Sequence, residues 1–341
     1  IRVPGSWNGL SIGGHTLTGT GYATYRLTVL LNGTSSVLAL KFLDMGTAYT
    51  VFADGVRILA VGNAGTTPEL TVPGYSPQVV DIVPTSRRLE LIYQVSNFHH
   101  RRGGAWEVIQ LGTPGQIHDI RGRRLEFDLI LFGSLIIMGL YHIALFPHRS
   151  RRDLSPVYFG LFCVVIAVRI LITVERYALH LLPRLDWEWF VAVEYLTSAL
   201  TVPALALFIY HLFTEEFHRF ILRGMIAVSL VSAFVVLVTP ARVYSQFVTF
   251  YQLFMVSCFA YGIYVIVRAV RRNREGARVI LVGCVILAGT VINDILDIDE
   301  VFYTSHFAHV GLFVFTLSYA IFLSFRYSRA FITVDLQREG L

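Results

Sequence analysis

Two hydrophobic patterns follow each other along the chain and change near residue 120. Before that point, apolar and polar residues alternate in short stretches, as in residues 25–30 and 37–42. Alternation with a period of two is typical of strands that bury one face. Asp54-Gly55 lies between two such stretches, and both residues tolerate the positive φ angles of a tight hairpin. Strand-like stretches recur about every 8–12 residues without a helical period, which predicts a β-sandwich or jelly roll over residues 1–115.

Long apolar runs replace this alternation in the rest of the chain. A helix needs roughly 20 apolar residues to cross a hydrocarbon core of about 30 Å, and each run comes close to that length. The seven runs are residues 125–146, 157–179, 189–213, 220–238, 247–270, 279–296 and 307–325. They predict an all-α bundle of seven transmembrane helices over residues 125–326, with residues 116–124 as a linker. Residues 327–341 are expected to continue the last helix as a cytoplasmic tail.

Arginines in the loops indicate the orientation in the membrane. Arginine-rich segments follow the first, third, fifth and seventh runs, whereas the opposite side carries the acidic stretch at residues 297–300. Because positively charged loops stay in the cytoplasm, the β domain is predicted outside it and the C-terminus inside. The arginine cluster at residues 121–124 opposes this orientation. Export of the whole β domain by a signal peptide ahead of Ile1 would override that cluster.

Composition narrows the classes of partner. Of the 341 residues, 55% are hydrophobic and 15% charged, and the net charge is +5. The arginines lie in short clusters between apolar runs, where membrane topology explains them, so no nucleic-acid partner is expected. Cys163, Cys258 and Cys284 all fall in apolar runs, so disulfides are not expected to stabilise the β domain.

A set of motifs in the membrane part marks a family. Residues 153–162, DLSPVYFGLF, are followed by Arg169 and by Glu175-Arg176-Tyr177. The order continues with Glu194-Tyr195, Gly276-Ala277, residues 293–296 and residues 323–331. In this order the chain resembles the bacterial seven-transmembrane receptors with diverse intracellular signalling modules. The resemblance implies a receptor of the bacterial inner membrane that drives a cytoplasmic signalling module beyond Leu341, and no catalysis by this chain itself.

The β domain has a resemblance of its own. Residues 4–8, 21–27, 48–55, 62–65 and 97–104 resemble a galactose-binding-like jelly roll, the fold of carbohydrate-binding modules and sensor ectodomains. This implies an extracytoplasmic small molecule or glycan as ligand. The candidate ligand-binding residues are Trp7, Asn8, Asn97, His99 and Arg101. A structural role is the alternative to ligand binding. Trp7 would then be a core tryptophan at one end of the sandwich, and residues 97–104 would form a structural loop.

Charged and polar residues inside the predicted helices indicate that these helices do more than anchor the protein in the membrane. An arginine at the depth of Arg169 costs about 2.5–3.5 kcal/mol even on the mildest scale, so it needs a partner. We expect a pair between Arg169 and Glu194, with Asn293 and Asp294 nearby, because Arg169, Glu194 and Asp294 all lie in the outer halves of their helices. This intramembrane polar network is either a switch that couples the β domain to helix packing or a static clamp.

Seven-helix membrane proteins can also bind retinal or act as membrane-embedded hydrolases. Retinal binding needs a lysine in the last helix, whereas Lys41 is the only lysine and lies in the β domain. A membrane-embedded metal-dependent hydrolase needs three ligands at one depth, but His142 and His211 lie near inner helix ends and His309 at an outer end. His306, His309 and Asp294 together are the one arrangement left open, and no metal or cofactor is expected. The second alternative is a receptor whose ligand binds within the helix bundle.

The C-terminal tail has a weak coiled-coil pattern. Tyr327, Ala330, Val334 and Leu341 are spaced nearly as in a heptad repeat. Such a pattern would pair two protomers into a homodimer, and a solvated helix is the alternative.

Overall fold

The computed structural model describes residues 3–33, 36–45, 47–144, 154–298 and 307–339, with side chains of 297–298 and 324–339 excepted. The chain forms two compact units. The first unit comprises Ile1–Ile130, Val168–Thr197 and Ala233–Val248, and the second unit comprises Leu131–Ala167, Ser198–Ser232 and Thr249–Leu341. The β domain belongs wholly to the first unit.

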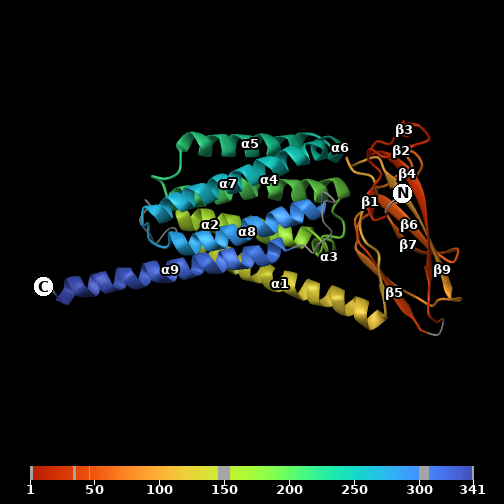
Figure 1. The fold of residues 1–341 in the computed structure, drawn as a ribbon, viewed down its shortest axis with the longest axis horizontal. Helices are drawn as coiled ribbons and strands as arrows, with labels where there is room; N and C mark the ends of the chain where they lie inside the picture. Colours follow the sequence, from red (N-terminus) through yellow and green to blue (C-terminus); the bar gives the residue numbers. More distant parts are fainter. Residues whose placement is uncertain (1–2, 34–35, 46, 145–153, 299–306, 340–341) are drawn as a thin grey trace. The chain divides into compact units, whose positions relative to one another are not determined.

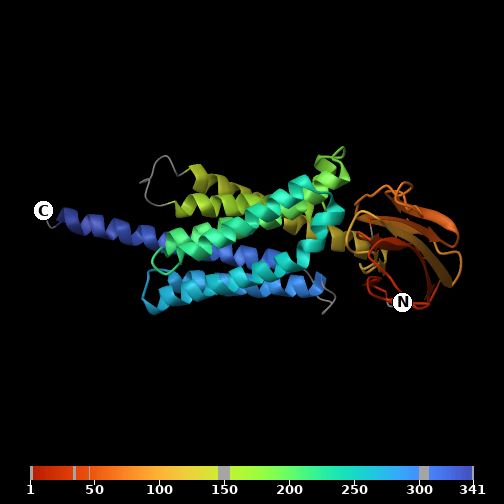
Figure 2. The ribbon, with the colours of Figure 1, turned by 90° about the horizontal axis from the view of Figure 1, so that it is seen from above.

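The β domain is an antiparallel sandwich, drawn in red to orange (Figures 1 and 2). The strands are β1 Gly5–Ser6, β2 Ser11–Ile12, β3 His15–Thr16, β4 Gly21–Leu30, β5 Leu38–Phe42, β6 Ala48–Ala53, β7 Val56–Val61, β8 Gln78–Ile82, β9 Arg88–Asn97, β10 Gly104–Ala105 and β11 Gln110–Gly112. One sheet has the order β4-β9-β6-β7 and the other the order β11-β5-β8, with two short pairs, β1-β10 and β2-β3. The chain passes repeatedly from one sheet to the other, as in a jelly roll.

Alternation builds the core of this sandwich. Along β9, Leu89, Leu91, Tyr93 and Val95 are buried at every second position, as the pleat of a strand requires. The predicted hairpin joins β6 to β7, and Asp54 and Gly55 have φ of 47° and 83°. The predicted β-sandwich is therefore confirmed.

Helices make up the rest of the chain, from the yellow α1 to the blue α9 in Figure 1. They are α1 Pro114–Ala144, α2 Ser155–Ile172, α3 Ala178–Leu181, α4 Trp187–Leu212, α5 Arg219–Val238, α6 Ala241–Tyr244, the 3-10 turn η2 Ser245–Phe247, α7 Val248–Arg271, α8 Ala277–Ile298 and α9 Ala308–Glu339. Six helical segments of the described chain are long and apolar enough to cross a membrane. They are Pro114–Ala144, Ser155–Ile172, Trp187–Leu212, Arg219–Val238, Ala241–Arg271 and Ala277–Leu296. The shorter apolar stretch Ala308–Leu323 fits the predicted seventh helix, so the all-α membrane part is confirmed.

Two boundaries differ from the sequence prediction. Residues 116–124, expected as a linker, are helical, because α1 begins at Pro114. Thr113 and Gln116 form a capping box there: the Thr113 N–H donates to Gln116 Oε1 (3.1 Å) and the Gln116 N–H to Thr113 Oγ1 (3.4 Å). The second predicted run extended to residue 179, but α2 ends at Ile172. Val174 and Arg176, at φ of 56° and 49°, end the helix in a turn before α3.

The second unit has an aromatic core and close helix contacts. Phe159 of α2 lies 4.0 Å, between ring centroids, from Tyr319 of α9, and Phe208 of α4 packs against both. Between α1 and α2, a Cβ added to Gly160 would lie 2.7 Å from the Gly139 carbonyl oxygen. These two backbones therefore approach too closely for any side chain at residue 160.

Several predictions fall outside the described residues. They concern the arginines at 149–152, the first residue of the DLSPVYFGLF motif, Asp299, Glu300 and His306. The backbone of the tail is helical to Glu339, but the side chains of its heptad positions are not described, and Leu341 lies outside the described residues.

Candidate functional site

Oppositely charged side chains from the β domain and the helix ends are buried together in the first unit. Lys41 of β5 and Asp44, just after that strand, are 4% and 9% exposed, and Glu175 and Arg176 of the α2–α3 turn are equally buried. We call the set Lys41, Asp44, Arg121, Glu175, Arg176 and Glu194 the charged junction. Buried charges persist only when they are paired, so these contacts determine where the turn lies against the β domain.

One half of the charged junction surrounds Glu175. Its Oε1 is ion-paired with the Nζ of Lys41, and its Oε2 lies 3.3 Å from the Nε of Arg121 on α1. Arg121 also donates to the carbonyl oxygen of Pro77 at 3.4 Å. Two cations from different elements therefore share one buried carboxylate.

The other half surrounds Arg176. Its Nε donates to Asp44 Oδ2, and its Nη1 donates to Glu194 Oε2 at 2.8 Å and to the carbonyl oxygen of Ile172 at 3.0 Å. The guanidinium lies 4.1 Å from the ring centroid of Tyr75, a cation–π contact. The planar guanidinium group suits such a site because it can bind two carboxylates and an aromatic face at once.

Burial and charge act against each other at this arginine. Burial lowers the pKa of Arg176, but the carboxylates of Asp44 and Glu194 outweigh burial and raise it above its usual value. Burial raises the pKa of Asp44, although the Arg176 charge opposes it. The arginine is thus charged at any physiological pH, and Asp44 depends on it for a counter-charge.

The loop at residues 97–104 makes a second set of contacts in the first unit. His100 Nε2 lies 3.1 Å from the Tyr195 hydroxyl of α4, and the Arg101 N–H donates to Ser245 Oγ at 3.0 Å. The His99 ring meets the edge of Trp187 at 6.2 Å between centroids. Burial, with the charge of Arg101, lowers the pKa of His100 to about 4. His100 is therefore neutral at physiological pH.

The predicted ligand-binding residues lie close together at one corner of the sandwich. Trp7 is 3% exposed, and its Nε1 donates to the Gly19 carbonyl oxygen at 3.3 Å. Asn8 Nδ2 donates to the Arg101 carbonyl oxygen at 2.9 Å. Asn97 is fully buried, and its Nδ2 lies 2.7–2.9 Å from the carbonyl oxygens of Gly19, His100 and Arg102. These contacts favour the alternative role for Trp7 and Asn97, which hold the loop that places His99 and Arg101.

The predicted intramembrane network is distributed over both units. In the first unit, Arg169 Nη1 donates to the backbone oxygen of Glu194 at 2.9 Å, and the Glu194 carboxylate binds Arg176. In the second unit, Asn293 donates to Asp294 at 3.2 Å, and Asp294 accepts the N–H groups of Phe307 and Ala308 at 2.7 and 3.0 Å. Asp294 therefore caps the N-terminus of α9, where a negative charge is favourable.

Sequence reasoning missed the central residues of the charged junction. Glu175 and Arg176 lie inside an apolar run, and Lys41 occupies an alternating strand, so each charge was a visible irregularity. The partners of Glu175 and Arg176 in the β domain lie far away in the chain: Lys41 is 134 positions from Glu175, and Asp44 is 132 from Arg176. No pattern along the chain indicates these distances.

Histidines do not gather into a metal centre in the described chain, where no three His, Cys, Asp or Glu side chains lie together. In the second unit, His211 stacks on Tyr158 at 5.0 Å, and His142 meets the edge of Phe159 at 5.1 Å, both between ring centroids. Both imidazoles pack against aromatic rings of the helix core.

Comparison with known proteins concerns mainly the helical part. A search among curated proteins found no match. Among solved structures, the chain is similar to a protein described as a beta-galactosidase from Bacteroides fragilis, at 18% identity and a TM-score of 0.24. That similarity covers 33% of this chain and 18% of that protein, and at this TM-score it supports no conclusion. The model of the family described as 7TM diverse intracellular signalling matches residues 124–326, which is more than half of the chain. The chain therefore belongs to the 7TM diverse intracellular signalling family and is a multi-pass transmembrane sensor.

Proposed function

We propose that the protein is a receptor of the bacterial inner membrane. Its sandwich recognises a ligand outside the cytoplasm, and the charged junction relays the bound state to the helices. A cytoplasmic signalling module, in the same chain or a separate one, responds to α9. The observation that supports this proposal is the burial of Lys41 and Asp44 of the β domain against Glu175 and Arg176.

The relay depends on the cost of separating buried charges. Removing one partner of a buried ion pair costs about 3–5 kcal/mol, so the sandwich and the α2–α3 turn move together. Glu194 binds Arg176 through its carboxylate and Arg169 through its backbone oxygen. A movement of Arg176 therefore displaces Glu194, and Glu194 in turn displaces Arg169 of α2. In the second unit, Asn293 and Asp294 hold the start of α9, and two protomers pair along this helix.

A double-mutant cycle tests the relay. Lys41→Met leaves Glu175 buried beside Arg121 alone, and Glu175→Gln leaves the Lys41 ammonium unpaired, so each single variant destabilises the contact by about 3–5 kcal/mol. The double variant buries neither charge and recovers most of this loss. Hydrogen exchange of the full chain, read at β5 and at residues 173–177, measures the effect. If each single variant speeds exchange only in its own segment, the two segments are uncoupled and the relay fails.

We propose a carbohydrate as the ligand, on the strength of the resemblance of residues 4–8, 21–27, 48–55, 62–65 and 97–104 to galactose-binding-like domains. Asn8, His99 and Arg101 supply the polar contacts, and Trp7 and Asn97 hold their loop. The full chain in detergent is expected to bind a restricted set of sugars on a glycan array, and Arg101→Ala is expected to weaken binding about tenfold or more. Arg57→Ala, at an exposed position of β7, is the matched control. Absence of any bound sugar, or equal binding by Arg101→Ala, would refute the carbohydrate proposal.

A further inference from the structure

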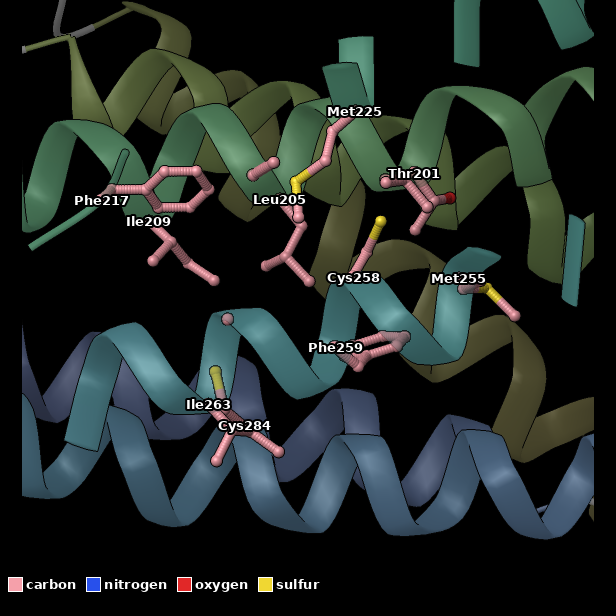
Figure 3. Close-up of a pocket in the computed structure, with 13 residues that line it drawn as sticks. Thr201, Leu205, Ile209, Phe217, Met225, Met255, Cys258, Phe259, Ile263 and Cys284 are labelled. Atoms are coloured by element: carbon pink, nitrogen blue, oxygen red, sulfur yellow. The ribbon is translucent and has the colours of Figure 1, made fainter. Parts of the chain in front are cut away.

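An apolar pocket opens within the second unit, between the C-terminal half of α4 and the middle of α7, and α5 and α8 complete its walls (Figure 3). Its empty space is about 490 Å³, counted out to the open mouth. Its position along two membrane-length helices places it within reach of the hydrocarbon core.

The chemistry of the walls selects the kind of molecule that fits. No charged side chain lines the pocket. Leu205 and Ile209 of α4 face Cys258 and Ile263 of α7 across the space (Figure 3). Met225 adds a flexible thioether, which adapts to irregular apolar shapes. Walls of this kind gain free energy only by covering apolar surface, so a hydrocarbon chain fits and a polar molecule does not.

A glycine keeps the space open. Gly262 on α7 lines the pocket, and a Cβ added there would have Ile209 Cδ1 at 3.4 Å as its near neighbour, an ordinary van der Waals distance. The position therefore tolerates a first carbon, and the rest of a larger side chain would enter the space. Ala206 lines the pocket from α4 and is likewise small.

We propose that this pocket is a binding site for an aliphatic chain, inserted between α4 and α7. The chain comes either from a membrane phospholipid or from a free fatty acid, which have the same hydrocarbon chemistry. Its occupancy determines how closely α4 and α7 pack, and it thus gives the helices an input separate from the charged junction. The proposal stands independently of the ligand of the β domain.

Photolabelling tests this proposal directly. The full chain is reconstituted in vesicles of phosphatidylethanolamine and phosphatidylglycerol that contain either a diazirine-bearing palmitic acid or a phospholipid with the same diazirine chain. After illumination, mass spectrometry locates the modified residues. In the wild-type protein, label is expected at pocket residues such as Leu205, Cys258 and Ile263. Labelling by the free acid alone identifies a fatty acid as occupant, and labelling by both probes identifies any lipid chain.

Matched variants separate a site from ordinary lipid contact. Gly262→Leu fills the pocket and is expected to lower labelling there about tenfold, equivalent to about 1.4 kcal/mol. Gly224→Leu adds the same side chain at an exposed position of α5 with nothing within 4 Å, and its pocket labelling is expected to equal that of the wild type. Ala206→Val is the second filling variant, used if Gly262→Leu does not fold. Label spread evenly over lipid-facing residues, or unchanged by both filling variants, would overturn the proposal.

Discussion

Replacing Arg176 with glutamine is expected to lower the free energy of unfolding of the first unit by about 3–5 kcal/mol. The substitution removes the charge that separates the carboxylates of Asp44 and Glu194. Asp44 would then lose its counter-charge and Glu194 would keep only the nearby charge of Arg169, so the repulsion between the two carboxylates in a site shielded from water would no longer be balanced. The cation–π contact with Tyr75 is lost as well. Of the substitutions in the charged junction, this one affects the largest number of partners.

Hydrogen exchange at β5 and at the α2–α3 turn of the full chain measures the loss. Arg26→Gln is the matched control, because Arg26 pairs with Glu90 on the sandwich surface and its side chain is 67% exposed. Exposed pairs contribute about 0–1 kcal/mol, so the control is expected to stay near the wild type. Equal exchange in the two variants would mean that the charged junction does not hold the turn. A loss confined to β5 would limit its role to the sandwich.

Gly160→Leu is expected to destabilise the second unit by about 3 kcal/mol or more. The first added carbon would lie 2.7 Å from the backbone oxygen of Gly139 and 2.9 Å from Ile143 Cγ1. A backbone atom cannot turn aside as a side chain can, so α1 and α2 must separate. In lipid, helices associate largely through close packing at small residues, and separation loses that contact outright. The aromatic contacts of Phe159, the preceding residue, would shift with it.

Unfolding of the reconstituted chain by increasing amounts of a denaturing detergent measures this loss. Gly133→Leu, also in a membrane helix, is the control, because a Cβ there meets nothing within 4 Å. The control is expected to unfold with the wild type. If both variants unfold alike, side-chain volume in the helices matters generally and the α1–α2 contact has no special weight.

Local pattern explains why much of the fold was predictable. Leu89, Leu91, Tyr93 and Val95 alternate because a strand places successive side chains on opposite faces, and this alternation is written in consecutive residues. Asp54-Gly55 predicts its hairpin because few residue pairs tolerate two positive φ angles. The start of α1 was missed because the capping box at Thr113 and Gln116 lies outside the apolar run, the signal used to place the helix.

The two-part architecture, the membrane-length helices and the family can be predicted from the residues alone, because strand alternation, apolar run length and short motifs are local properties. The sequence also shows that Arg169 interrupts an apolar run and needs a partner, whereas Glu175 is a visible irregularity whose partner it does not name. The partners themselves appear only in the folded chain: the carbonyl oxygen of Glu194 accepts a hydrogen bond from Arg169, and Lys41 pairs with Glu175. A buried charge can pair with any opposite charge that lies close to it. Which charges lie close depends on how distant segments pack, and no local pattern encodes that packing.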